Sequence, residues 1–289
     1  MESAQNPQAD RGGNGHNGKF RRGIYILPSL FTVGTLVCGY FAILASFRGS
    51  ELAMAGAAPT VSGGVFDSAA KAIGLAILFD GFDGRIARMM NSSSNFGREF
   101  DSLADIIAFG VAPAILAFAW GVRGVLDAPA GPDQMLRKLA WVITFAFVIC
   151  GAARLARFNI DSVKPVTDRR FFIGLPIPAG AGVIAAVVHW HKDILSSAPA
   201  AFTWLGVVAA LSFLMVSRLR YYSFKTIDLR RRRPYIVIIL LGVAVWAIWA
   251  FSEPALFTIA LVYALSGIVL RVVSRVRPHP PAPKKVHVA

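Results

Sequence analysis

The sequence DGFDGRIARMMNSSSNFGREFDSLAD, residues 80–105, places four aspartates and three arginines between two strongly apolar segments. Asp80 and Asp83 are three residues apart, and Asp101 and Asp105 are four apart, so each pair lies on one face of a helix. The connection between the pairs is rich in Ser and Asn, which favour turns, and is short enough to make the two helices antiparallel neighbours. We therefore predict that the four carboxylates face one another at one end of a helical pair.

The composition of the whole chain is that of a membrane protein. Of the 289 residues, 55% are hydrophobic and only 16% are charged, whereas a soluble domain carries roughly a quarter of charged residues. Several apolar runs reach about 20 residues, which is enough for a helix to cross a hydrocarbon layer of roughly 30 Å. We predict an all-α polytopic membrane protein with about eight transmembrane helices, near residues 26–46, 66–88, 100–120, 138–157, 174–191, 199–217, 234–252 and 255–272.

The basic residues are distributed unevenly between the two sides of this predicted membrane domain. The odd-numbered loops and adjoining helix ends hold six of the 30 Lys and Arg residues, and the terminal segments and even-numbered loops hold the other 24. Because positive charge is retained on the cytoplasmic side, both termini are predicted to be cytoplasmic, as in a bacterial-type inner membrane. We therefore interpret the net charge of +14 and the Arg run 231–233 as residues that determine the membrane topology and contact anionic lipids. Binding of nucleic acid is the less favoured interpretation.

The two ends of the chain lack apolar periodicity. Residues 1–18 are rich in Gly, Asn and Gln, and residues 276–289 are basic and proline-rich. Neither segment can bury enough apolar surface to offset the entropy lost on ordering the chain. We predict that both are disordered tails.

The carboxylates of residues 80–105 need a compensating charge. Glu99 adds a fifth negative charge, against the three arginines, and four converging aspartates without cations would repel one another or take up protons. Oxygen ligands without His or Cys suit a hard divalent ion, so Mg²⁺ or Mn²⁺ is predicted and zinc is not. Two other interpretations stay open: Asp–Arg pairs that cap helix ends, and a cation transporter or channel, although the charges gather at one membrane face instead of the midplane.

Three glycines accompany the aspartates, at positions 81, 84 and 97. A glycine inside a helix costs roughly 1 kcal/mol relative to alanine, so their presence suggests that something bulky approaches the backbone closely. A nucleotide diphosphate would fit this description, and Arg88 could bind a phosphate with its forked donors. From the residues alone, the stretch predicts metal-dependent phosphoryl chemistry at a membrane surface.

Eight positions of this stretch are similar to a known family. The spacing D-x2-D-G-x2-A-R-x8-G-x3-D-x3-D resembles the signature of the CDP-alcohol phosphotransferases without a mismatch. Within that family, the amino-acid sequence is most similar to that of the integral-membrane phosphatidylserine synthases in segments 27–43, 79–114, 153–159 and 174–182. The resemblance implies a six-helix core in residues 19–217, two additional helices in residues 218–275, and a homodimer.

The resemblance also implies a reaction and a set of roles. CDP-diacylglycerol and L-serine would give phosphatidylserine and CMP in a polar cavity that faces the cytoplasm. Asp105 would be the general base for the serine hydroxyl. The metal would be bound by Asp80, Asp83 and Asp101, and Asp105 would share a metal ion with them. The nucleotide and its diphosphate would be bound by Thr32, Gly84, Ala87, Arg88 and Gly97.

The acceptor alcohol is less well defined by the sequence. Arg154 and Arg157, three residues apart at the end of the fourth predicted span, could bind the serine carboxylate. They could equally be topology determinants that contact lipid phosphates. An enzyme with the same chemistry and another acceptor, such as glycerol phosphate, inositol phosphate or choline, is the closest alternative.

Overall fold

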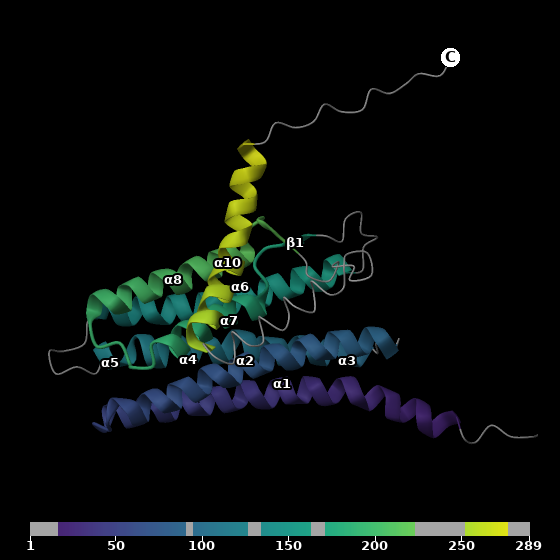
Figure 1. The fold of residues 1–289 in the computed structure, drawn as a ribbon, viewed down its shortest axis with the longest axis horizontal. Coiled ribbons are helices and arrows are strands. Elements are labelled where there is room, and N and C mark those ends of the chain that lie inside the picture. The colour runs from purple at the N-terminus through teal and green to yellow at the C-terminus, as the bar shows by residue number, and fades with distance from the viewer. Residues whose placement is uncertain (1–16, 91–94, 127–133, 163–170, 223–251, 277–289) are drawn as a thin grey trace, which may run out of the picture.

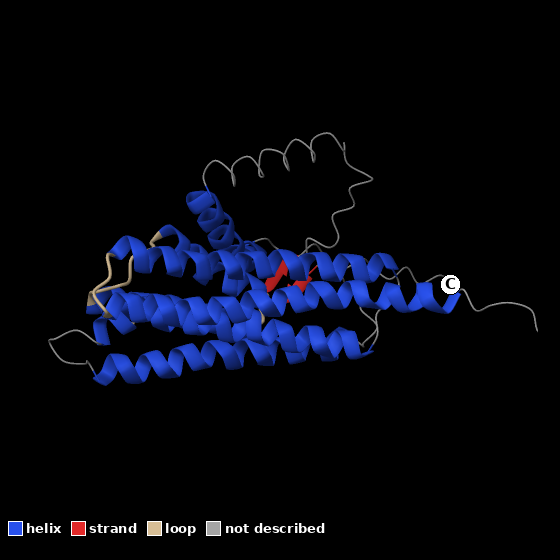
Figure 2. Ribbon diagram, turned by 90° about the horizontal axis from the view of Figure 1, so that it is seen from below, coloured by secondary structure: helices blue, strands red, loops and turns tan. Residues whose placement is uncertain are grey.

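The fold was obtained as a computed structural model that describes residues 17–90, 95–126, 134–162, 171–222 and 252–276. Long helices lie side by side along one direction (Figures 1 and 2). In chain order the elements are α1 (Asn17–Met54), α2 (Pro59–Met90), α3 (Asn95–Asp105), η1 (Ile106–Val111), α4 (Ala112–Gly121), α5 (Arg123–Leu126), α6 (Gln134–Ser162), β1 (Phe171–Ile173), α7 (Ile177–Trp190), α8 (Ala198–Val216), β2 (Arg220–Tyr222) and α10 (Ser252–Val276).

Five helical segments of the described chain are long and apolar enough to cross a membrane: Leu30–Met54, Pro59–Asp83, Phe96–Gly121, Gln134–Ile160 and Ala198–Val216. Each overlaps one of the predicted spans, so the prediction of a polytopic helical membrane protein is confirmed. The predicted span 174–191 corresponds to α7, whose 14 residues extend only about 21 Å. The predicted span 234–252 falls almost wholly outside the described residues, and 255–272 lies within α10.

Helix α1 begins at Asn17 and therefore includes the last two residues of the predicted N-terminal tail. The rest of that tail and the C-terminal tail, apart from Val276, lie outside the described residues.

Small residues bring the helices close together in the interior. Gly39 of α1 lies against Ala108, and a Cβ atom added at Gly39 would be 2.7 Å from the Ala108 Cα. Close contact through Gly and Ala is how membrane helices gain packing energy, since lipid offers no hydrophobic driving force between them. The glycine thus lets α1 pack directly on the helix that carries two of the aspartates.

That helix, Phe96–Gly121, changes its hydrogen bonding directly after Asp105. The segment η1 is a π-helical turn, in which the Ala112 N–H donates to the Ile107 carbonyl. Pro113 follows in the first turn of α4. A proline inside a regular α-helix would remove one backbone hydrogen bond and its ring would clash with the preceding turn, but the first turn tolerates it. Single π-turns are rare and occur often at functional sites. The π-helical turn begins directly after Asp105.

Two three-residue strands accompany the helices and leave the predicted all-α class unchanged. Strand β1 pairs antiparallel with β2, with Phe172 opposite Tyr221. Gly174 follows β1 with a φ of +82°, and a Cβ atom there would lie 2.3 Å from the Met215 carbonyl oxygen. The strands therefore close the neighbouring ends of α7 and α8, and Figure 2 shows them in red beside the helices.

Helix α10 packs against α7 and β2. Figure 1 shows it crossing the bundle steeply, with its C-terminal end projecting away from the other helices. Its apolar part, Glu253–Val269, is shorter than the five long spans.

Candidate active site

Three of the four predicted aspartates meet in space. Asp80 comes from α2, and Asp101 and Asp105 come from α3. One carboxylate oxygen of each lies within 4.8 Å of the other two, which is the spacing of ligands that share a metal ion. The convergence of carboxylates predicted from the i, i+3 and i, i+4 spacings is thus present for this trio.

Asp105 is the most enclosed member of the trio. Its side chain is buried, and its Oδ1 atom has no hydrogen-bond partner among the described residues. An unsatisfied buried acceptor costs roughly 1–3 kcal/mol. The Asp105 carboxylate also interacts electrostatically with the carboxylates of Asp80 and Asp101. A hard divalent cation would satisfy that oxygen and offset the repulsion, so the donor set fits a metal of the Mg²⁺ or Mn²⁺ type.

Asp83 is held differently from the other three aspartates. Its Oδ2 atom accepts a hydrogen bond from the Thr32 hydroxyl of α1, and both side chains are buried. Asp83 is not part of the trio of converging oxygens. Thr32, predicted to contact the nucleotide, therefore orients Asp83 and ties α1 to α2 beside the site.

The predicted nucleotide-binding residues are only partly described. Gly84, Ala87 and Arg88 lie in α2, but their side-chain surroundings fall outside the described part of the structure. Gly97 is half-buried in α3. Gly81, next to Asp80, is exposed, and a Cβ atom placed there would meet no described atom within 4 Å.

The two predicted acceptor arginines lie in different environments. Arg154 is buried, its guanidinium carbon lies 5.7 Å from the centre of the Phe158 ring, and it interacts electrostatically with Asp105. Its Nε atom has no hydrogen-bond partner among the described residues. Arg157 is exposed and donates a hydrogen bond of 3.3 Å to the Val216 carbonyl at the end of α8. Of these two arginines, Arg154 is the one that interacts electrostatically with a member of the carboxylate trio.

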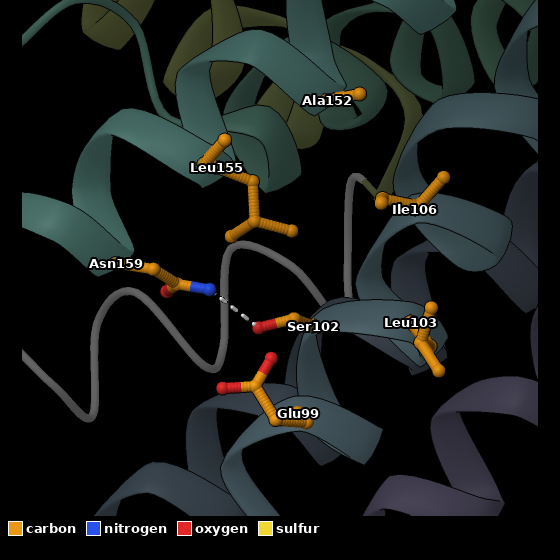
Figure 3. A pocket seen from close by; sticks show the side chains of 8 residues that line it. Glu99, Ser102, Leu103, Ile106, Ala152, Leu155 and Asn159 are labelled. Carbon is orange, nitrogen blue, oxygen red and sulfur yellow. Dashed lines mark hydrogen bonds between the residues drawn. The ribbon is translucent and has the colours of Figure 1, made fainter.

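A pocket of about 270 Å³ opens between α3–η1 and α6. Polar residues line one end of it, where Asn159 donates a hydrogen bond of 2.9 Å to the Ser102 hydroxyl (Figure 3). Leu103, Ile106 and Leu155 line the rest. Ser102 follows Asp101 by one residue, which turns it about 100° around the helix, so the pocket uses a different face of α3. Sequence reasoning did not identify Ser102 or Asn159, because a single Ser and a single Asn in apolar helices carry no pattern.

Comparison with known proteins gives a consistent result. The CDP-alcohol phosphatidyltransferase family model matches residues 25–221, which include all four aspartates and both arginines. A CDP-diacylglycerol–serine O-phosphatidyltransferase of Helicobacter pylori (strain J99) is 32% identical over 249 residues, 85% of this chain and 91% of that protein. The enzyme of the same name from Methanocaldococcus jannaschii is 32% identical over 195 residues, 68% of this chain and 80% of the relative.

A further relative of that name, from Saccharomyces cerevisiae, is 39% identical over 120 residues, 40% of this chain and 39% of the yeast protein. The range of the family model spans the helices that carry the carboxylate trio and Arg154. This chain belongs to the CDP-alcohol phosphatidyltransferase family.

Proposed function

We propose that this chain is an integral membrane enzyme that transfers the phosphatidyl group of CDP-diacylglycerol to L-serine, giving phosphatidylserine and CMP. The observation that carries the chemistry is the convergence of Asp80, Asp101 and Asp105 around a buried, unsatisfied oxygen. The choice of serine is supported by relatives that share nearly their whole length with the chain and are named for that acceptor.

The carboxylate trio would hold the divalent metal on which enzymes of this family generally depend. The all-oxygen donor set favours Mg²⁺ or Mn²⁺. A bound ion supplies positive charge against the diphosphate of the substrate and the departing CMP. Asp83, oriented by Thr32, would complete the acidic surface as a further ligand.

The nucleotide and diphosphate would lie along α2 and the start of α3. Gly84, Ala87 and Gly97 would leave the backbone accessible to the nucleotide, because their side chains are small or absent. Arg88 would donate to a phosphate oxygen as a fork, and Thr32 would lie at the edge of the same surface. The acyl chains of the substrate would stay between helices in the bilayer.

Asp105 would act as the general base. It accepts the proton of the serine hydroxyl while the hydroxyl oxygen forms a bond to the phosphorus that carries the diacylglycerol, and the bond from this phosphorus to CMP breaks. Burial fixes this carboxylate in place. One of its two oxygens would bind the metal and the other would accept the proton. Asparagine at this position would keep the shape and lose the base.

Arg154 would bind the serine carboxylate. A buried guanidinium beside the proposed base offers two parallel donors to a carboxylate, and this arrangement would bring the serine hydroxyl toward Asp105. Arg157 would be a second contact for serine at the exposed edge of the site, one helical turn from Arg154. Its hydrogen bond to the Val216 carbonyl would hold the side chain in place. Choline lacks a carboxylate, so an enzyme specific for choline would have no use for Arg154.

The proposed architecture keeps the division made from the sequence. A core of six spans in residues 19–217 would carry the site, and residues 218–275 would add two helices, for eight in all. The distribution of Lys and Arg supports cytoplasmic termini and a cytoplasmic site in a bacterial-type inner membrane. A homodimer is the proposed assembly.

The test is CMP release by the purified protein with CDP-diacylglycerol, Mn²⁺ or Mg²⁺, and a panel of acceptors. We expect release with L-serine and little with glycerol phosphate, inositol phosphate or choline. Preference for another acceptor would replace serine but keep the chemistry. Absence of CMP with every acceptor, together with cation flux in proteoliposomes, would favour a transporter instead.

A further inference from the structure

Helix α3 carries two of the three converging carboxylates but does not pack closely against α6. It packs against α1, whereas α6 packs against η1, the next segment of the chain. The backbones of α3 and α6 diverge toward the beginning of α3, where the pocket of about 270 Å³ opens between them. Figure 3 shows Asn159 of α6 and Ser102 of α3 reaching toward one another at this pocket. Side chains therefore make the connection where the helices do not pack.

The hydrogen bonds of Ser102 have a fixed direction. The hydroxyl donates its one proton to the Arg98 carbonyl, four residues earlier in α3, over 3.0 Å. It is therefore an acceptor toward α6, and the Asn159 amide nitrogen donates to it over 2.9 Å. An ionised carboxylate or an apolar side chain at position 159 could not donate this bond. The bridge thus needs a donor on α6 and a hydroxyl on α3.

This bridge fixes the rotation of α3 beside the carboxylates. Ser102 directly follows Asp101, and the two side chains project about 100° apart around the helix. A rotation of α3 that separates Asp101 from Asp80 would also break the bond to Asn159. One oxygen of each carboxylate in the trio lies within 4.8 Å of the other two, where the groups repel in the absence of a cation. The hydrogen bond opposes the movement that this repulsion favours.

We propose that Asn159 is a positioning residue of the metal site, which holds α3 through Ser102 in the orientation required for the carboxylate trio. This inference rests on the metal site of the proposed function and adds a residue that acts without touching the metal. An ion binds more tightly to ligands that are already in place, because less of its binding free energy is used to order them. Asn159 thus contributes to metal affinity from a helix that supplies no carboxylate to the trio.

The test is a titration of Mn²⁺ into the purified full chain without substrate, which measures metal affinity independently of turnover. Asn159→Leu removes the donor and keeps nearly the same shape, and Ser102→Ala removes the acceptor. We expect each to raise the metal concentration for half-saturation about fivefold, within the contribution of one hydrogen bond between uncharged groups. The double variant should show no further increase, because both residues act through one bond. The metal concentration for half-maximal CMP release with serine should shift by the same factor.

Two control variants separate positioning from a general loosening of the fold. Ser102→Thr keeps a hydroxyl that can bond to the carbonyl four residues earlier, and the adjoining pocket has room for its methyl group. Its metal affinity should stay close to that of the parent. Ser68→Ala is the matched control on α2, since Ser68 donates the same kind of bond, of 2.9 Å, to the Gly64 carbonyl and lies 12 residues from Asp80. It should leave metal affinity unchanged.

Three results overturn the inference. The first is unchanged metal affinity in Asn159→Leu, or additive effects in the double variant. The second is an equal loss in Ser102→Thr and Ser102→Ala, because the hydroxyl then carries no part of the effect. The third is an equal loss in Ser68→Ala, which would show that metal affinity follows the stability of the whole fold.

Failure of the proposed function is recognised separately, in the unsubstituted protein. If it binds Mn²⁺ but releases no CMP with any acceptor, the proposed function falls and the titration still decides the role of Asn159. If it releases CMP with serine and Asn159→Leu binds Mn²⁺ as the parent does, only the inference about Asn159 falls. If it binds neither Mn²⁺ nor Mg²⁺, both proposals fall.

Discussion

Asp67 and Asp105 lie toward opposite ends of the bundle and are equally buried, each 8% exposed, but their partners differ. Asp67 of α2 bonds to the His189 ring of α7 and forms an ion pair of 2.8 Å with Lys71. Asp105 shares its surroundings with two other carboxylates and keeps an oxygen that no described residue satisfies. Burial therefore does not distinguish a functional aspartate from a structural one in this protein, whereas the partners do.

The difference indicates what each end of the bundle does. Along α2, Asp67 and Asp80 are 13 residues apart, or about 20 Å, so the two clusters are physically separate. A carboxylate that bonds to a histidine ring and a lysine ties helices together and needs nothing further. Carboxylates that gather with one another raise the energy of the protein until a cation binds. Substitutions in the Asp105 cluster should therefore lower turnover, whereas substitutions in the Asp67 cluster should lower stability.

The largest expected effect is that of Asp105→Asn. We expect CMP release to fall at least about a thousandfold, because a residue proposed both as base and as metal ligand is removed, while binding of CDP-diacylglycerol is retained. Asp67→Asn is the matched control: the same chemical change at equal burial should lower the melting temperature and leave the kcat of the folded protein within about twofold. Serine-dependent CMP release at the unsubstituted rate in Asp105→Asn would rule out the role.

Metal dependence gives the next effect in size. A chelator should abolish CMP release, and Mn²⁺ or Mg²⁺ should restore it. In Asp101→Asn, the metal concentration needed for half-maximal activity should rise roughly 10–100-fold, since one of three converging ligands is lost. Isothermal titration of the metal into the protein without substrate measures the same change independently of turnover. Equal metal affinity in the variant and the parent would exclude Asp101 as a ligand.

The sequence predicted that four aspartates converge, and three of them do, because the geometry is local. Spacings of three and four residues determine a helix face, and a short polar connection brings two helices together, so Asp80, Asp101 and Asp105 could be associated without a structure. Hydropathy predicted the long spans for a similar reason, since each span is one continuous run. The apolar run 174–191 also predicted a span, but the helix α7 that forms there has only 14 residues. Composition alone did not show that this helix is so short.

The contacts that the sequence could not predict join distant segments. Thr32 and Asp83 are 51 residues apart, and Asp67 and His189 are 122 apart. Nothing in the pattern around His189 marks it as the partner of an aspartate. Strands β1 and β2, three residues each and separated by more than 40 residues, are too short to show a period of two. Such features arise from tertiary packing, which determines partners after the helices have formed.

Arg154 and Arg157 allow a sharper comparison within the acceptor side. We expect Arg154→Lys to raise the KM for serine at least about tenfold, because lysine cannot bind a carboxylate in the bidentate manner of a buried guanidinium. Arg157→Lys should change it by no more than about threefold, since that side chain is exposed and bonds to a backbone carbonyl. Steady-state kinetics with varied serine provide the measurement. The reverse order of effects would assign the acceptor contact to Arg157.

At the opposite end of the bundle, His189→Ala removes one of the two partners of a buried carboxylate. A hydrogen bond to a charged group contributes about 1.5–3 kcal/mol, so the melting temperature should fall, partly offset by Lys71, whose side chain is 62% exposed. Lys71→Gln, the matched control on the same aspartate, should have a smaller effect because water screens that pair. Both variants should keep their serine KM. An unchanged melting temperature in His189→Ala would show that the Asp67–His189 contact does not stabilise the fold.

The smallest effect should come from Lys192→Gln. The pair between Lys192 and Glu253 is short, at 2.6 Å, but the two side chains are 40% and 41% exposed, and an exposed pair contributes at most about 1 kcal/mol. The hydrogen bond to Glu253 raises the pKa of the Lys192 ammonium above its ordinary value of 10.5. A group with a raised pKa in the folded protein stabilises it fully below the ordinary pKa and loses that contribution as the pH rises through the folded value.

The difference in melting temperature between Lys192→Gln and the parent should therefore be constant across neutral pH and should shrink only above about pH 10.5. High salt should reduce it at any pH. Serine KM should not change, because Trp190, Phe257 and Tyr221 still hold α10 in place. A rise in serine KM in this variant would mean that the ion pair, and not the aromatic contacts, determines how α10 packs against α7 and β2.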